Sequence, residues 1–412
     1  MMDACSSTPA ARTLSVSGSW AMYQMAPSHD AIVTNATIPT NWKYDAGGQI
    51  NGGLAVVDNR VFLDTLAGNV MALDLHTGKP LWSVKLDNLV MSTPIVSQDL
   101  VIVGTGRNGN GHNQQGSFVY VYAVDPANRS GFWGRDEGDH VEALDAVTGK
   151  VRWTYRTAGE DMPSPAYVAG TVIFANGDGH AYALNAASGE ALWRQPLNGI
   201  ATMASATAAK HTIFVSVCSH AQTKGNTIAL SQEGTVLWRA PYGNCDSSPT
   251  YGDGEVFVSG VDGNRTTFGF GGHTIIAALN RANGRPLWTY RTPTAGPYTR
   301  IGSSERAIAG TYADDMYFQP IATGDELLAF DAKTGTVRWR VRTQGPVKMS
   351  PVIVDGSVYF GDTSGVFYKL RERDGTLQAT RIFDKPFATS PPVLVGHTIV
   401  CANGSTVYTF QL

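Results

Sequence analysis

The stretch Ala143-Leu-Asp-Ala-Val-Thr-Gly-Lys-Val-Arg-Trp153 decides the fold of this chain. An apolar strand ends at Asp145, a tight turn follows at Thr148 and Gly149, and a second strand carries Trp153. A glycine followed four residues later by tryptophan recurs along the chain, at Gly78/Trp82, Gly149/Trp153, Gly189/Trp193, Gly234/Trp238, Gly284/Trp288 and Gly335/Trp339. These pairs use six of the nine tryptophans, so one repeated turn organises the sequence.

Each repeat is predicted to form four short antiparallel strands. The segment Ser350-Pro-Val-Ile-Val-Asp-Gly-Ser-Val-Tyr-Phe360 shows the first half most clearly, with alternating β-branched and aromatic residues around an Asp-Gly turn. Units of this kind begin near Ile50, Ser92, Ser164, Ser205, Ser247, Ser304, Ser350 and Ser390. This count predicts an all-β fold, an eight-bladed β-propeller of four-stranded antiparallel blades.

The two ends of the repeat array complement each other. The last unit, residues 390–412, has only three strands, and an orphan strand with Trp42 precedes the first unit. We therefore predict that the N-terminal strand closes the last blade, which leaves no sheet edge open in the ring. Residues 1–38 are predicted to be a tail and lead-in segment, and residues 39–412 a single propeller. Unit seven departs from the pattern, because Ala379 stands where tryptophan should follow Gly375.

Composition excludes several function classes. With 43% hydrophobic and 16% charged residues and 45 glycines, the chain is typical of a folded, turn-rich protein. A net charge of −3 gives no electrostatic reason to expect a nucleic-acid partner. No run of 18 apolar residues predicts a membrane span. We expect a periplasmic or extracellular protein that lacks its signal peptide here, and a lipid on Cys5 is left open.

The predicted blades place every long insertion on one face. The loops between second and third strands and the connections between blades share that face, and the insertions fall at 104–140, 219–225, 261–273 and 291–303. Long loops commonly carry function. We therefore expect a ligand or active site in the central funnel on this face.

Charged residues replace the repeat consensus near the blade entries on this face. Asp161, Asp246 and Glu305-Arg306 are expected to point toward the funnel, where a carboxylate can act as a general base and an arginine can hold an anion. A salt bridge that fastens loops is the alternative, and it stays open. The predicted catalytic residues are Asp246 and Glu305, and the predicted substrate-binding residues are Arg306, Arg300, Arg265, Asp161, Arg107 and His112.

Cysteine usage predicts no metal centre. The four cysteines form no CxxC pair, and the loop 108–115 lacks the carboxylate spacing of a calcium loop. Cys218 and Cys245 fall on the elaborated face between neighbouring blades, where they form either a disulfide or two free thiols. Cys401 is predicted to be core.

An eight-bladed propeller whose blades carry Ala-Leu-Asp-x-x-Thr-Gly-x-x-x-Trp resembles the PQQ-like (quinoprotein-type) propeller superfamily over roughly residues 40–412. The resemblance implies that the repeated tryptophans pack between neighbouring blades. It implies little about function, since this fold hosts several activities.

Three functions are compatible with the resemblance. A PQQ-dependent dehydrogenase would be expected to carry vicinal cysteines and a calcium-binding carboxylate set. A non-catalytic scaffold similar to the outer-membrane assembly propeller lipoprotein would contact an outer-membrane protein or the membrane.

The favoured alternative is a hydrolase without cofactor, similar to the tetrathionate hydrolases of acid-loving sulfur oxidisers. It would act on a small anionic sulfur compound, and it accounts both for the missing quinone features and for the charged blade entries. A homo-oligomer is left open.

Overall fold

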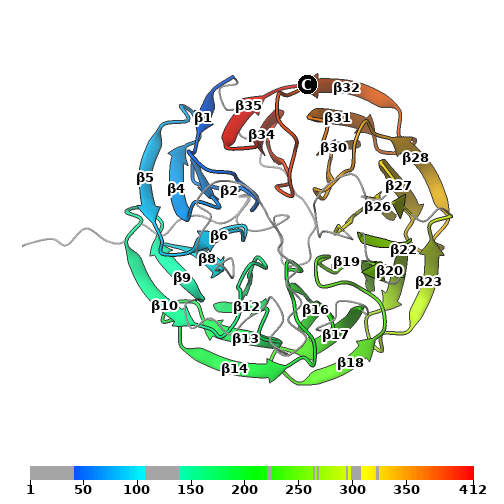
Figure 1. Ribbon diagram of the computed structural model, residues 1–412, viewed down its shortest axis with the longest axis horizontal. Helices are drawn as coiled ribbons and strands as arrows, with labels where there is room; N and C mark the ends of the chain where they lie inside the picture. Colours follow the sequence, from blue (N-terminus) through cyan, green and yellow to red (C-terminus); the bar gives the residue numbers. More distant parts are fainter. Residues whose placement is uncertain are drawn as a thin grey trace, which may run out of the picture.

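The computed structural model describes residues 41–97, 99–106, 139–219, 225–262, 265–266, 269–293, 296–297, 308–321 and 324–412. For residues 262, 265–266, 269–272 and 296–297 it describes the backbone alone. The described residues form strands and turns arranged as eight antiparallel blades around a central axis (Figure 1). This confirms the predicted eight-bladed β-propeller.

In each blade the strands follow one another outward from the axis to the outer edge of the ring. The first four blades are formed by β2 (Ala55–Val57), β3 (Arg60–Asp64), β4 (Asn69–Asp74) and β5 (Pro80–Lys85); β7 (Ile95–Ser97), β8 (Leu100–Gly106), β9 (His140–Asp145) and β10 (Val151–Arg156); β11 (Ala166–Val168), β12 (Thr171–Ala175), β13 (His180–Asn185) and β14 (Ala191–Pro196); and β15 (Thr207–Ala209), β16 (Thr212–Cys218), β17 (Gly225–Ser231) and β18 (Val236–Ala240).

The other four blades follow the same plan. They are formed by β19 (Thr250–Gly252), β20 (Glu255–Asp262), β22 (Gly269–Asn280) and β23 (Pro286–Arg291); β25 (Thr311–Ala313), β26 (Met316–Ile321), β27 (Glu326–Asp331) and β28 (Val337–Arg342); β29 (Val352–Val354), β30 (Ser357–Gly361), β31 (Val366–Arg371) and β32 (Leu377–Ile382); and β33 (Val393–Val395), β34 (Thr398–Asn403), β35 (Thr406–Phe410) and β1 (Lys43–Asp45). Short strands β6 (Leu89–Val90), β21 (Arg265–Thr266) and β24 (Gly296–Pro297) extend blades 2 and 5.

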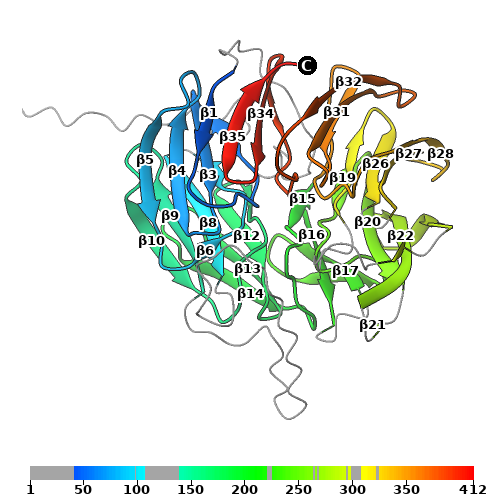
Figure 2. The ribbon, with the colours of Figure 1, turned by 45° about the horizontal axis from the view of Figure 1, so that its top comes forward.

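The ring closes as predicted. Strand β1 pairs antiparallel with β35, with Lys43 opposite Tyr408 and Asp45 opposite Thr406. Figure 2 shows the N-terminal strand lying beside the C-terminal hairpin. The innermost and outermost strands of blade 8 therefore come from opposite ends of the chain.

The Gly-x3-Trp motif joins neighbouring blades. Gly149 has a φ of +72°, and a Cβ built on it would lie 2.8 Å from the indole Cε3 of Trp82 in the preceding blade. Only glycine fits both the backbone conformation and the ring above it. Each indole N–H also donates to a carbonyl of the next blade at 2.6–3.1 Å, from Trp42, Trp82, Trp153, Trp193, Trp238, Trp288 and Trp339.

The exception at Ala379 follows from the closure. Blade 8 has no turn between its third and fourth strands, because these strands are β35 and β1. A tryptophan on β32 would have no glycine turn to cover. An aromatic cluster lies between blades 7 and 8 instead. The ring centroid of Phe383 is 5.1 Å from that of Phe387 and 5.4 Å from that of Phe410, and the guanidinium carbon of Arg381 lies 4.6 Å from the centroid of the Phe410 ring.

The core lies between blades. The second and third strands are almost wholly buried, as in β8, whereas the outer strands alternate half-buried and exposed positions, as along most of β14. Among the described residues, no helix is long and apolar enough to cross a membrane.

Candidate functional site

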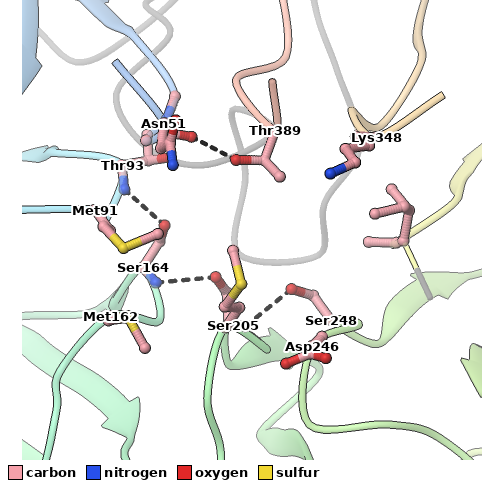
Figure 3. A pocket seen from close by; sticks show the side chains of 15 residues that line it. Asn51, Met91, Thr93, Met162, Ser164, Ser205, Asp246, Ser248, Lys348 and Thr389 are labelled. Carbon is pink, nitrogen blue, oxygen red and sulfur yellow. Dashed lines mark hydrogen bonds between the residues drawn. The ribbon is translucent and has the colours of Figure 1, made fainter. Parts of the chain in front are cut away.

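A pocket lies on the propeller axis, on the face where the innermost strands begin (Figure 3). It holds about 500 Å³ of space, including the part open to solvent. We call it the axial pocket. Its rim is built from one position of the repeat, which is occupied by Asn51, Met91, Met162, Met203, Asp246, Lys348 and Thr389.

Two residues after each rim position, a second ring tightens the contact between blades. Gly53 donates its backbone N–H to Thr93 Oγ1 at 2.7 Å, and Thr93 donates in the same way to Ser164 Oγ at 2.7 Å. The series continues from Ser164 to Ser205 at 3.0 Å and from Ser205 to Ser248 at 2.9 Å. We call Thr93, Ser164, Ser205 and Ser248 the hydroxyl arc.

The rest of this second ring is different. Blades 6 and 8 carry Ala309 and Pro391, which have no hydroxyl. In blade 7 the Ser350 hydroxyl donates to the Ala309 carbonyl at 2.9 Å, so its proton is used within the protein. The hydroxyl arc is therefore confined to blades 2–5.

The rim has two chemically distinct parts. Met91, Met162 and Met203 come from consecutive blades and form a half-buried thioether arc, whose soft side chains adapt to irregular shapes. Asn51, Lys348 and Thr389 form a polar arc from blades 1, 7 and 8, and Figure 3 shows Lys348 and Thr389 across the pocket from Met91. Among the described lining residues, Lys348 is the one cation and Asp246 the one carboxylate.

Asp246 is held by two hydrogen bonds and adjoins a disulfide. The Thr202 hydroxyl donates to its Oδ1, and its own backbone N–H donates to Asn244 Oδ1 at 2.9 Å. The preceding residue, Cys245, is bonded to Cys218, with 5.0 Å between the two Cα atoms. Of the two possibilities for these cysteines, the structure shows the disulfide. The carboxylate therefore has a fixed position at the pocket.

Asp161 does not face the funnel, contrary to expectation. Its side chain is buried between blades 2 and 3, where it accepts bonds from the Thr157 hydroxyl and from Asn176 Nδ2 at 3.0 Å. Burial raises its pKa well above the usual range. The rim position belongs to the next residue, Met162, because rim residues stand two places before the hydroxyl arc and Asp161 stands three places before Ser164.

Most of the other predicted site residues lie outside the described residues. They are Arg107, His112, Arg300, Glu305 and Arg306, and for Arg265 the backbone alone is described, in β21. Sequence reasoning missed Lys348 and the three methionines. The signal for them was their common offset from the Ser/Thr positions of the repeat.

Asp64 is a buried carboxyl behind the pocket wall. It is fully buried, and neither of its oxygens has a hydrogen-bond partner among the described residues. A Cβ built on Gly52, a lining residue, would lie 3.0 Å from its Oδ1. At the same register position blades 3 and 8 have Ala175 and Ala402. Burial raises the pKa of Asp64 well above its usual range, which favours the neutral acid.

The donor set of the described lining does not fit a quinone with bound calcium. Calcium takes six to eight oxygen ligands, commonly several carboxylates. The described lining supplies a single carboxylate, and the described part of the chain contains no group of three His, Cys, Asp or Glu residues that could hold a metal ion.

The chain belongs to the family of PQQ-like propellers whose model is described as outer membrane protein assembly factor BamB. This model matches residues 31–209, 177–319 and 271–410. The chain is 25% identical to the tetrathionate hydrolase of Acidithiobacillus ferrooxidans over 366 residues, which cover 85% of this chain and 70% of that protein. It is 24% identical to the outer membrane protein assembly factor BamB of Yersinia pestis over 364 residues, 85% of this chain and 81% of that one.

Solved structures agree on the fold. The quinohemoprotein alcohol dehydrogenase of Comamonas testosteroni superposes with a TM-score of 0.68 at 12% identity, covering 96% of this chain and 81% of that chain. At this identity the likeness concerns the architecture alone.

Proposed function

We propose that the protein is a hydrolase of small anionic sulfur compounds such as tetrathionate, with its active site in the axial pocket. The observation that carries the proposal is the charge arrangement at the rim, where the fixed carboxylate of Asp246 and the ammonium group of Lys348 line one pocket with three thioethers. The similarity to a tetrathionate hydrolase over most of the chain supports it.

The rim chemistry suits this substrate class. Lys348 offers a compact positive charge for a sulfonate group, and the thioether arc offers a soft, polarizable surface for a chain of sulfur atoms. In this proposal Asp246 takes a proton from water as the general base. Attack of that water on one of the two central sulfurs of tetrathionate breaks the central S–S bond. It yields thiosulfate, a hydroxylated sulfur–sulfonate product and one proton.

The other residues predicted for this reaction stay predictions. Glu305 is the second candidate base, and Arg265, Arg300 and Arg306 are candidate sulfonate ligands. Their side chains lie outside the described residues, so the proposal depends on Asp246 and Lys348.

We infer that the reaction takes place outside the cytoplasm. Disulfides persist mainly in oxidising compartments, and the Cys218–Cys245 bond adjoins the proposed active site. This bond supports the expectation, drawn from the sequence, of a periplasmic or extracellular protein.

The test is turnover of tetrathionate by the purified protein and its variants. Asp246→Asn is expected to lower kcat about 10²- to 10⁴-fold, as loss of a general base does. Lys348→Met is expected to raise KM, since it removes substrate charge pairing. The matched controls Asp253→Asn and Lys333→Met change exposed groups 3.7 Å apart, outside the pocket lining, and should behave like the parent. Absence of tetrathionate turnover by the parent, or an unchanged kcat in Asp246→Asn, would contradict the proposal.

A second candidate is a scaffold that contacts an outer-membrane protein, which the family match favours. A scaffold that docks partners through its loops does not need the rim side chains. It predicts co-purification with an outer-membrane protein that survives the Asp246→Asn and Lys348→Met changes.

A further inference from the structure

The hydroxyl arc presents four O–H groups whose protons have no hydrogen-bond acceptor among the described residues. Each oxygen of Thr93, Ser164, Ser205 and Ser248 accepts a backbone N–H from the preceding blade. A hydroxyl also has one proton to donate. No described residue accepts a hydrogen bond from any of these four hydroxyls, and all four side chains line the axial pocket.

The arc is preorganised rather than a chance cluster of surface serines. The four residues are nine-tenths or more buried and occupy one repeat position in four consecutive blades. Figure 3 shows Ser164, Ser205 and Ser248 following one another along one wall of the pocket. Because the inter-blade bonds fix each oxygen, little side-chain freedom remains to be lost when a ligand binds.

We propose that the hydroxyl arc binds a tetrahedral sulfur oxyanion, either free sulfate or the terminal sulfonate of a longer sulfur compound. Such a group carries acceptor oxygens in several directions, which matches donors spread along an arc. The choice of sulfur oxyanions as ligands rests on the proposed function. The hydroxyl arc adds to that function the place in the pocket where an SO₃ group lies.

The charge of Asp246 indicates which part of the hydroxyl arc holds the anion. Asp246 lies at the blade 5 end of the pocket, next to Ser248, and its carboxylate repels an anion there. Thr93, Ser164 and Ser205 belong to the blades that carry the methionines, which are uncharged. We therefore expect the anion near these three hydroxyls, with the thioether arc above it.

The experiment is calorimetric titration of the full chain with sodium sulfate and, separately, with sodium tetrathionate. Sulfate is not hydrolysed, so its binding is measured whether or not the protein turns over tetrathionate, and the two proposals fail independently. Thr93→Val is expected to weaken binding about ten-fold, the usual effect of losing a hydrogen bond to a charged group. Thr93→Ser keeps the hydroxyl and should restore affinity.

The matched control is Thr250→Val. The Thr250 hydroxyl donates to the Gly310 carbonyl of the next blade at 2.8 Å, and it does not line the pocket. Like Thr93→Val, this variant loses one hydrogen bond between a side-chain hydroxyl and the backbone of a neighbouring blade, although here the hydroxyl is the donor, and it should bind like the parent. Comparison with Thr250→Val therefore distinguishes a lost hydrogen bond to the anion from a weakened contact between blades.

Each outcome has one meaning. Binding of both anions, weakened by Thr93→Val and restored by Thr93→Ser, supports a site for free sulfate and sulfonate alike. The same pattern with tetrathionate alone supports a site for the end of a longer compound. No binding of either anion by the parent, or equal affinity in Thr93→Val and parent, overturns the proposal.

Discussion

Two halves of one ring surround the axial pocket, and they differ although the same repeat builds both. In blades 2–5 the second ring is regular, with a hydroxyl in every blade that accepts an N–H from its neighbour. In blades 6–8 and 1 it is irregular, with Ala309, Ser350, Pro391 and Gly53. The difference shows that structural bonds between blades can also leave donors for a ligand, where the sequence keeps them regular. The irregular half contributes Lys348 and the buried Asp64.

The largest expected effect concerns the bond at the end of the regular half. Cys218→Ser with Cys245→Ser opens a covalent link across a sequence separation of 27 residues. Loop-closure entropy predicts a loss of about 3–4 kcal/mol in the free energy of unfolding. Denaturant titration of parent and double variant, each with and without reductant, measures it. Reductant should destabilise the parent and leave the variant unchanged; equal stability of all four samples would contradict the expectation.

A smaller effect is expected from Asp64 in the irregular half. Because its folded-state pKa is raised, its contribution to stability is fully present below its unfolded pKa of about 3.9 and declines as the pH rises toward the folded value. Asp64→Ala, which introduces the residue found in blades 3 and 8, should therefore gain stability relative to the parent as the pH rises from 4 to 8, by about 1.4 kcal/mol for each pH unit over which the folded Asp64 stays protonated.

Thermal unfolding over this pH range measures the effect of Asp64. Asp355→Asn, at an exposed turn, is the control for removing an aspartate outside the core. A stability difference between Asp64→Ala and parent that does not change with pH would show that Asp64 does not titrate as its burial predicts.

The smallest expected effect tests whether the regular half can be extended. Ala309→Ser places a hydroxyl at the next position of the ring, on the far side of Asp246 from the three hydroxyls expected to hold the anion, and should leave sulfate affinity within about two-fold of the parent. Ala313→Ser, at the end of β25 and outside the pocket lining, is the control. Calorimetry with sodium sulfate decides it, and binding that is about ten-fold tighter in Ala309→Ser would contradict the placement of the anion near blades 2–4.

The fold could be predicted from the sequence because almost every blade carries its own copy of the same repeat. The repeat predicted eight blades and closure by the N-terminal strand, and the resemblance to the PQQ-like propellers implied tryptophans between blades; the structure confirms all three. The absence of tryptophan at Ala379 had no explanation from sequence, since its cause is the missing turn in blade 8. That cause becomes visible only when the two ends of the chain are paired.

The site was predicted less completely because its members are ordinary when viewed singly. Asp246 was found because a charge interrupted the consensus, and it does line the pocket. Asp161 attracted the same reasoning, yet a shift of one residue turns it into the space between blades. Lys348 and Met91 interrupt nothing, and their role emerges only when the positions two residues before the second ring are compared across blades.

The pairing of β1 with β35 also constrains the order of assembly in time. The backbone of Trp42 bonds to Thr409, 367 residues later, both through the Thr409 hydroxyl at 3.1 Å and through its N–H at 3.0 Å. While the chain is being synthesised, β1 has no partner until β35 has emerged, although blade 1 can already form from β2 to β5. Blade 8 is therefore the last blade that can be completed, so anything that holds β1 apart would also delay closure of the ring that surrounds the pocket.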